Sequence, residues 1–537
     1  MIIIKSDIRK NLFRVLLMLT PPLAIGLEGA AQSSVWFTST LQISSINQTF
    51  LDFTWTTNIA SSTAIRYGTT PSLELGTLNA GGSVVNHGIS LTGLSAATIY
   101  YVKAFSVAGT DTAFSPVKIV CTASGSSGEI RVYFNHPVDN NASTVTDAIY
   151  TPAFEDTIIT YIDKIQSTLD IALYNNTRAA TITAINNAYS RGVIVRYVAD
   201  KTTSNSALNN LNPAINVLKG NSSGIMHNKF AVIDRSSPNG AWVITGSVNW
   251  TYQSFFDDFN NLVIIQDQSL ARAYTLEFEE MWGGIGFSPD SLNSKFGTAK
   301  SDNTPHEFRI GGKNVQLYFS PSDNATGTIL KALNSAGSDI SFALLTLTRK
   351  DIADSLISAR NRGCLSRGAI EQINDVGSEY NYLLSNGIDV RSHLDSAGLL
   401  HHKYGIIDAN LSSSDPTVIT GSHNWTFSAE DVNDENMLVI HDNIIANMFL
   451  EEFEKRFNEL PMGIPEIKYQ SSKFKIQKGK IIIYDVLGRI AAILPVNSIY
   501  AADPSFLIHR NNFPAGIYFY KISSDSGISG SGKLVVE

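Results

Sequence analysis

The chain has 537 residues, of which 43% are hydrophobic and 16% are charged, a composition of folded domains rather than of a disordered chain. This length exceeds that of one ordinary domain and predicts three or four. The formal net charge of −8, from 40 basic and 48 acidic residues, excludes a bulk basic field, so a local group of cations must bind any polyanion. Cys121 and Cys364 lie far apart and indicate no disulfide framework.

Residues 1–31 have the order of a secretory signal sequence. Basic residues come first, the apolar run 15–19 follows, and small residues stand at 29–31. The apolar run is shorter than the roughly 20 residues that cross a bilayer, and no later stretch reaches that length. We therefore expect an exported chain that is cleaved near Ala31 and has no transmembrane span.

Residues 35–121 alternate apolar and polar side chains in short runs, such as 50–55 and 98–105, with turn signals between them. Several short strands at this spacing predict a β-sandwich. Trp55 and the turn Leu94-x-x-x-Thr98-x-Tyr100 resemble a fibronectin type III module, in which a tyrosine at this place has a structural role. The Ser- and Gly-rich segment 122–128 indicates a flexible linker.

An internal duplication follows. His-Asn-Lys-Phe-Ala-Val-Ile-Asp at 227–234 returns as His-His-Lys-Tyr-Gly-Ile-Ile-Asp at 401–408, and Thr-Gly-Ser-Val-Asn-Trp-Thr at 245–251 returns as Thr-Gly-Ser-His-Asn-Trp-Thr at 420–426. Helix-like and strand-like segments alternate around both motifs. We therefore expect a duplicated α/β core, with one α-β-α sandwich at 130–290 and a second at 308–460.

The last segment, 468–537, has short β runs at 481–489 and 513–521 around glycine turns and ends in Gly-Lys-Leu-Val-Val-Glu. It predicts a small C-terminal β-sandwich. The pattern resembles the C-terminal sorting domain of the type IX secretion system of Bacteroidetes-like bacteria. This resemblance implies that the machinery of that system is a partner and that the protein is secreted or held at the cell surface. A small terminal β-module of another purpose is the alternative.

The repeated histidine and lysine are predicted to share one face of a strand. The composition of 224–233 is β-rich, so alternation places His227 and Lys229 on one face and Asp234 on the other. In the second copy the same alternation pairs His401 with Lys403 and turns the intervening histidine away. The motif thus presents one imidazole and one ammonium group together, twice.

These groups match what the cleavage of a phosphodiester requires. Lysine and amide donors can neutralise the non-bridging oxygens as a pentacoordinate transition state forms. Two histidines can divide the parts of nucleophile and proton donor. The Gly-Ser turn before each asparagine lets the backbone approach a ligand closely. The candidate catalytic residues are His227, Lys229, Asn249, His401, Lys403 and Asn424.

The pattern His-x-Lys-x-x-x-x-Asp followed by Gly-Ser-x-Asn, complete in both copies, resembles the signature of the phospholipase D superfamily over about 130–460. The resemblance implies a reaction that passes through a phosphohistidine intermediate. It also implies that this reaction needs neither a metal nor a cofactor. It also implies that His227, in the first copy, is the nucleophile and that His401 is the acid and base. Two copies in one chain imply a site formed within a monomer.

One supporting position differs between the copies. Glu435 fits the acidic position downstream of the second motif, where a carboxylate of the family orients a histidine. The aligned residue of the first copy is Asn260. A carboxylate raises the basicity of imidazole and sets its tautomer. Either Asp258 therefore takes this part, or one histidine is held differently.

The remaining marked residues have plainer interpretations. We interpret Asp234 and Asp408 as structural supports, because they face away from the histidines, and we add Ser247 and Ser422 of the Gly-Ser turns to the supporting set. The pattern around Phe278 and Phe453 predicts a solvated helix face for the neighbouring glutamates. The residues interpreted as solvated, as packing or as incidental are Glu277, Glu279, Glu452, Glu454, Trp250, Trp425 and His423.

The substrate class stays open between lipid and nucleic acid. Two copies in one exported, acidic chain with an attached β-sandwich favour hydrolysis of the headgroup phosphodiester of phospholipids. An extracellular nuclease is the alternative, although no concentrated run of basic and aromatic residues marks a strand-binding groove. A catalytically inactive surface binding or adhesion protein is the second alternative, and two intact motifs argue against it.

Overall fold

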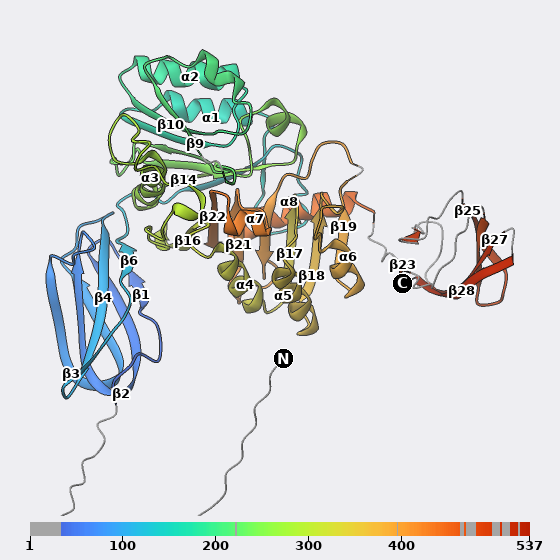
Figure 1. Cartoon of the computed structure of the whole chain (residues 1–537), viewed down its shortest axis with the longest axis horizontal. Coiled ribbons are helices and arrows are strands. Elements are labelled where there is room, and N and C mark those ends of the chain that lie inside the picture. Colours follow the sequence, from blue (N-terminus) through green and yellow to red (C-terminus); the bar gives the residue numbers. More distant parts are fainter. Residues whose placement is uncertain are drawn as a thin grey trace, which may run out of the picture.

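Figure 1 shows the computed structural model of the chain, which describes residues 34–220, 223–394, 396–461, 467–468, 479–496, 505–506, 516–524 and 527–536. The predicted signal sequence at 1–31 lies outside these residues. Within the described ranges, no helix is both long and apolar enough to cross a membrane.

The N-terminal domain consists of strands that pack around Trp55. The strands hydrogen-bond in the order β1-β2-β4-β5, with β3 on β2 and β6 on β4. Trp55 is 2% exposed, and the amide of Ser95 donates to Tyr100 Oη at 2.9 Å. The fibronectin type III assignment stays a prediction. The strands are β1 (Gln42–Ile46), β2 (Phe50–Gly68), β3 (Gly76–Thr92), β4 (Ile99–Ala108), β5 (Asp111–Phe114) and β6 (Lys118–Cys121).

The first half of the duplicated core is an eight-stranded sheet in the order β11-β10-β9-β12-β13-β14-β7-β8. The inner strands are largely apolar because both of their faces are covered, and the few charged side chains on them, such as Asp170 and Arg196, are buried as an ion pair. The elements are β7 (Ile130–Phe134), β8 (Ile149–Tyr150), α1 (Phe154–Asp163), β9 (Thr168–Leu173), α2 (Ala179–Ser190), β10 (Ile194–Asp200), β11 (Asn216–Gly220), β12 (Lys229–Ile233), β13 (Trp242–Gly246), β14 (Asn261–Gln266) and α3 (Gln268–Trp282).

The second half repeats this plan, with the sheet order β15-β16-β22-β21-β20-β17-β18-β19. β20, β21, β22 and α8 take the places of β12, β13, β14 and α3. The elements are β15 (Glu307–Ile310), β16 (Lys313–Ser320), α4 (Ala325–Ser335), β17 (Asp339–Leu344), α5 (Lys350–Asn361), β18 (Leu365–Ile370), α6 (Tyr380–Ser385), β19 (Asp389–Ser392), β20 (Lys403–Ile407), β21 (Thr417–Gly421), α7 (Phe427–Asp431), β22 (Glu435–His441) and α8 (Asn443–Glu459).

The two halves share one apolar core, to which both sheets, α3 and α8 contribute. Figure 1 shows α1 and α2 on the outer side of the first sheet and α4 and α5 on the outer side of the second. Since α3 and α8 lie between the two sheets, they have no solvated face at their centres. This arrangement brings the motif-bearing edges of the halves together.

The prediction of a solvated glutamate face on these helices is wrong. Glu277 is 1% exposed and pairs with Lys300 of the segment that joins the halves. Glu452 is also 1% exposed and accepts from His402 at 3.1 Å. Burial raises the pKa of Glu277, and the ammonium group of Lys300 acts in the opposite direction. The joining segment and the sheet of the same half thus provide partners on the face that the pattern of a single helix assigns to water.

The described residues of the C-terminal segment form a four-stranded sheet in the order β25-β24-β27-β28 and a short pair, β23-β26. The type IX sorting assignment stays a prediction. The strands are β23 (Ile467–Lys468), β24 (Gly479–Asp485), β25 (Ile490–Val496), β26 (Ser505–Phe506), β27 (Gly516–Ser524) and β28 (Gly527–Val536).

Candidate active site

The first histidine is held by the opposite half of the core. His227 precedes β12, and Lys229 is the first residue of that strand. Nδ1 of His227 lies 2.7 Å from Oε2 of Glu435, the first residue of β22. Because a carboxylate only accepts, Nδ1 is the donor and Nε2 is left for a substrate. Tyr174 packs against this imidazole in a T-shaped arrangement, with ring centroids 4.8 Å apart.

The second histidine is held in the same way by the first half, but by an amide. Nδ1 of His401 lies 2.9 Å from Oδ1 of Asn260. The Nδ2 of Asn260 donates to the carbonyl of Ser254 at 3.0 Å, which identifies Oδ1 as the acceptor that faces the histidine. Asp258 does not take this place: it accepts from the amide of Leu399 at 3.2 Å. Of the two arrangements left open by the sequence, the structure has a histidine held differently.

These crossed supports bring both imidazoles to one site. Short parallel bridges join Met226 to Asp434 and Phe259 to Leu400, so the residue before each histidine pairs with the opposite half. The amide of His401 itself donates to the carbonyl of Phe259 at 3.0 Å. The charge of His227 also helps to lower the pKa of His401. The two motifs therefore converge.

The lysines of the two motifs enter the same buried space. Lys229 Nζ donates to the carbonyl of His227 at 2.9 Å, and Lys403 Nζ donates to the carbonyl of His401 at 2.6 Å. Burial lowers the pKa of Lys229 to about 7, while Glu435 and Asp200 oppose the shift. Burial and then Lys229 lower the pKa of Lys403 well below its usual range. An anion bound among these groups would favour their charged forms.

Burial also governs the two imidazoles. It lowers the pKa of His227 to about 4, although Glu435 acts in the opposite direction. The pKa of His401 is lowered well below its usual value by burial and by Lys403 and Lys229. Its amide partner supplies no charge to offset these effects. The duplicated motif thus holds two imidazoles in different electrostatic surroundings.

The loops that contain Asn249 and Asn424 follow Gly246 and Gly421, where the backbone leaves no room for a side chain. Gly246 has a φ of 135°, and a Cβ there would lie 2.4 Å from the carbonyl oxygen of Asn261. Ser247 then donates to Asn260 at 2.8 Å, so the loop and the support of His401 form one network. Ser247 also accepts from the amide of Asn261 at 3.0 Å, and Ser422 accepts from the matching amide of Asn436 at 3.0 Å. Oδ1 of Asn249 and of Asn424 is buried and has no hydrogen-bond partner among the described residues.

The two motif aspartates lie at the far ends of their strands from the histidines. Asp234 accepts from the amides of Gln166, Ser167 and Thr168 at 2.7–3.0 Å. Asp408 accepts from the amides of three residues in the matching turn, Gly337, Ser338 and Asp339, at 2.8–3.2 Å. Each aspartate therefore fixes the turn that leads into β9 or β17.

Before each motif histidine, one further carboxylate holds the backbone in place. The sequence analysis identified neither of these two carboxylates. Asp200 accepts from the amide of Met226 at 2.8 Å. Glu371 accepts from the amide of Leu400 at 2.8 Å. Both residues end or follow the strand beside β9 or β17. They differ in type and in distance from their motifs, so the signal available was their shared place at the carboxyl ends of β10 and β18.

His402 and the residues interpreted as packing or incidental are buried around the two motifs. His402 points away from Lys403, between Glu452 and Asn261. Trp250 and Trp425 are 3% and 0% exposed, as packing residues are. His423 is buried 3.4 Å from Glu430. His423 also lies close enough to Glu435 to help lower the pKa of that carboxylate.

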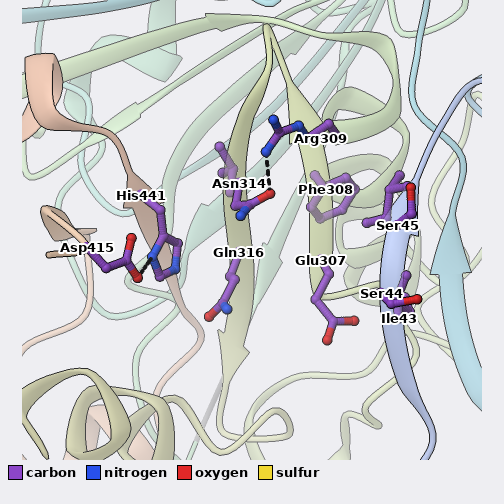
Figure 2. Close-up of a pocket in the computed structure, with 12 residues that line it drawn as sticks. Ile43, Ser44, Ser45, Glu307, Phe308, Arg309, Asn314, Gln316, Asp415 and His441 are labelled. Carbon is purple, nitrogen blue, oxygen red and sulfur yellow. Dashed lines mark hydrogen bonds and ion pairs between the residues drawn. The ribbon is translucent and has the colours of Figure 1, made fainter. Parts of the chain in front are cut away.

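Two other features of the described residues lie apart from the histidines. A pocket of about 580 Å³ opens between β1 and β15 and contains none of the candidate catalytic residues (Figure 2). One group has the spacing of metal ligands in the searched part of the chain: Asp302, His306 and Asp323. In it, His306 Nδ1 lies 2.9 Å from a backbone carbonyl. Neither feature belongs to the candidate site.

The duplicated core is similar to known proteins. Residues 158–282 and 329–458 match the family described as "Cardiolipin synthase, PLD-like domain". The mitochondrial cardiolipin hydrolase of Xenopus tropicalis is 36% identical over 121 residues, which are 22% of this chain and 55% of the relative. That of Chlamydomonas reinhardtii is 31% identical over 150 residues, 27% of this chain and 64% of the relative. The chain thus spans 55% and 64% of these two relatives.

Solved structures resemble the same region. The phospholipase D family member Nuc from Salmonella typhimurium is 30% identical, over 28% of this chain and 98% of that chain, with a TM-score of 0.25. The phosphatidylserine synthase of Haemophilus influenzae Rd KW20 is 12% identical, over 63% of this chain and 90% of that chain, with a TM-score of 0.44.

Proposed function

We propose that this chain, which carries a PLD-like domain of the phospholipase D superfamily, cleaves phosphodiesters at one site to which both halves contribute. The observation that carries the proposal is the crossed support of His227 by Glu435 and of His401 by Asn260. A structural histidine needs no partner from the opposite repeat. Two such histidines with a buried lysine beside each are the groups that phosphoryl transfer uses.

In the first step, Nε2 of His227 attacks phosphorus and the bond from phosphorus to the leaving oxygen breaks. Protonated His401 gives its Nε2 proton to that oxygen. The phosphorylated imidazole of His227 carries positive charge, which the carboxylate of Glu435 stabilises through Nδ1. Lys229 and Lys403 offset the charge that develops on the non-bridging oxygens.

In the second step, water attacks the phosphorus and gives its proton to Nε2 of His401. The bond from phosphorus to His227 breaks, and a phosphomonoester leaves. The proton that His401 gave up is thereby restored. No residue in this cycle changes its oxidation state, and we propose that neither step requires a metal or a cofactor.

The proposed substrates are phospholipids, cleaved at the headgroup phosphodiester. The support is the likeness to mitochondrial cardiolipin hydrolases, which reaches 36% identity over 121 residues, and the acidic charge of the chain. An extracellular nuclease of the same superfamily stays the alternative. We further propose export by a signal sequence and a type IX system, supported by the patterns at 1–31 and 468–537.

The test is to trap the covalent intermediate. The full chain is mixed with a ³²P-labelled phosphodiester in the presence of a chelator, quenched, and digested for peptide mapping. We expect acid-labile label on the peptide of His227 in the wild type, and none in His227→Asn. Label on His401 alone would reverse the two roles. Absence of both label and turnover would refute the enzymatic proposal.

The substrate class is tested separately. Release of a headgroup from phospholipid vesicles and cleavage of single-stranded DNA are measured on one preparation, again with a chelator. We expect turnover of the vesicles. Cleavage of DNA without lipid turnover would leave the phosphodiesterase proposal standing and replace its substrate.

A further inference from the structure

Each half places an exposed aromatic ring just after its catalytic asparagine. Tyr252 follows Asn249 by three residues and is 56% exposed, and Phe427 holds the matching position after Asn424 and is 53% exposed. In each half, the tryptophan that lies between the asparagine and the exposed ring, Trp250 or Trp425, is buried. A ring that served only packing would be inside, so the duplication contains an outward aromatic twice at the same distance from the site.

An arginine covers the aromatic ring in both halves. The guanidinium of Arg178 lies 5.7 Å from the ring centre of Tyr252 and 5.5 Å from that of Phe256. The guanidinium of Arg349 lies 4.4 Å from the ring centre of Phe427. Each arginine directly precedes a helix, α2 or α5. The arrangement is therefore built from the same two elements in each repeat.

Both guanidinium groups are already neutralised. Arg178 pairs with Glu155 at 2.6 Å, and Arg349 pairs with Asp351 at 2.5 Å. Such pairs add polarity beside the rings but little net charge. A nucleic-acid groove would instead need cations that are free to replace the counterions of successive phosphates.

Aliphatic side chains extend the exposed aromatics. Leu399 is 44% exposed, stands two residues before His401, and its carbonyl accepts from the amide of Phe259 at 2.8 Å. Val376 is fully exposed at 101%. Its loop packs beside Thr348, whose amide donates to the carbonyl of Trp425. We call these five exposed residues the apolar rim: Tyr252, Phe256, Val376, Leu399 and Phe427.

We propose that the apolar rim seats the mouth of the active site on a phospholipid surface. The inference rests on the proposed function and deepens it. Aromatic rings with polar neighbours prefer the interface between headgroups and acyl chains, where arginine stems can also lie. Leu399 and Val376 offer no flat face for stacking a base, but they add apolar area to an interface. Both repeats place an exposed ring at the same position after the candidate catalytic asparagine, and we interpret these exposed apolar groups as one interaction site.

The experiment separates docking from chemistry. In a His227→Asn background, flotation with phosphatidylcholine and phosphatidylglycerol vesicles is measured for the intact rim and for Tyr252→Ser/Phe256→Ser/Phe427→Ser. The matched control is Ile285→Ser/Phe287→Ser/Leu292→Ser, three exposed apolar residues outside the rim with exposures of 82%, 43% and 94%. We expect binding to weaken at least tenfold in the rim variant and less than twofold in the control.

With His227 restored, we expect the rim variant to hydrolyse vesicles at least tenfold more slowly and bis(p-nitrophenyl) phosphate at the wild-type rate. Equal vesicle binding by both triple variants would overturn the docking proposal. So would a rim variant that loses affinity for single-stranded DNA and not for vesicles. Rim-dependent vesicle binding without lipid turnover would support docking while refuting the proposed lipid substrate.

Discussion

Glu435 in the second half accepts from Nδ1 of His227 in the first at 2.7 Å, whereas its counterpart in the first half, Asn260, accepts from Nδ1 of His401 at 2.9 Å. The geometry is symmetric and the chemistry is not. A carboxylate stabilises a positively charged imidazole, and an amide leaves an imidazolium a stronger acid. The difference suits a nucleophile that becomes cationic on His227 and a proton donor on His401.

The first prediction concerns this pair. Glu435→Gln keeps a hydrogen-bond acceptor for Nδ1 but removes the charge, so the phosphorylated imidazole loses its counterion. We expect kcat to fall on the order of a hundredfold or more, with the fold unchanged by circular dichroism. Glu459→Gln, at the exposed end of α8, is the matched control and keeps the wild-type rate. A Glu435→Gln enzyme within threefold of wild type would contradict the role of the carboxylate.

The second prediction concerns the lysines. Lys229→Met and Lys403→Met preserve length and remove the ammonium groups that we propose to offset charge on the phosphoryl oxygens. Because the charge to be neutralised is greatest in the transition state, each change lowers kcat by on the order of a hundredfold, with a smaller effect on KM. Steady-state kinetics on a soluble diester measures both constants. A rise in KM at constant kcat would make the lysines ground-state clamps instead.

The third prediction is an acidic pH optimum. The pKa of His227 is about 4, so the neutral nucleophile appears as the pH rises through that value. The pKa of Lys229 is about 7, so its charge is lost as the pH rises further. The pKa of His401 is also lowered, which removes the proton donor in the same direction. We expect kcat/KM to peak between about pH 4 and 7.

The pH profile also responds to Glu435. This carboxylate raises the pKa values of both His227 and Lys229 against the effect of burial. Its removal therefore lowers both values, and Glu435→Gln moves the basic limb of the profile to lower pH. A wild-type maximum above pH 8, or a basic limb that moves upward in the variant, would contradict this electrostatic account.

The duplication made the architecture readable, because the motif lengths and the alternating elements repeat in order. The strand predicted over 224–233 begins only at Lys229, as β12, and His227 lies just before it. The sequence did not predict that each motif histidine is held by a residue of the opposite half. An alignment of the copies pairs Glu435 with Asn260, yet each acts on the histidine of the other repeat. Only the packing of the halves determines this.

The buried glutamates show the same limit. Around Phe278, a helix with one apolar stripe predicts glutamates in water. In the structure Lys300, from the segment between the halves, enters beside Glu277. An ion pair between separate segments of the chain produces no periodic pattern in the sequence. The amide network of Asn436 and Asn228, which donate and accept across the halves at 3.1 Å, is hidden for the same reason.

The last prediction separates support from catalysis. Asp234 receives three backbone amides where the chain enters β9, and its side chain lies at the opposite end of β12 from His227. Asp234→Ala leaves these amides without their acceptor, so we expect a loss of about 2–4 kcal/mol in the free energy of unfolding. Asp408→Ala removes the equivalent contacts and loses a similar amount. Urea denaturation measures both, and the kcat of the folded fraction stays near the wild-type value. A variant with wild-type stability and a hundredfold lower kcat would instead place the aspartate in the chemistry, since a turn support acts on the population of folded enzyme and not on its rate.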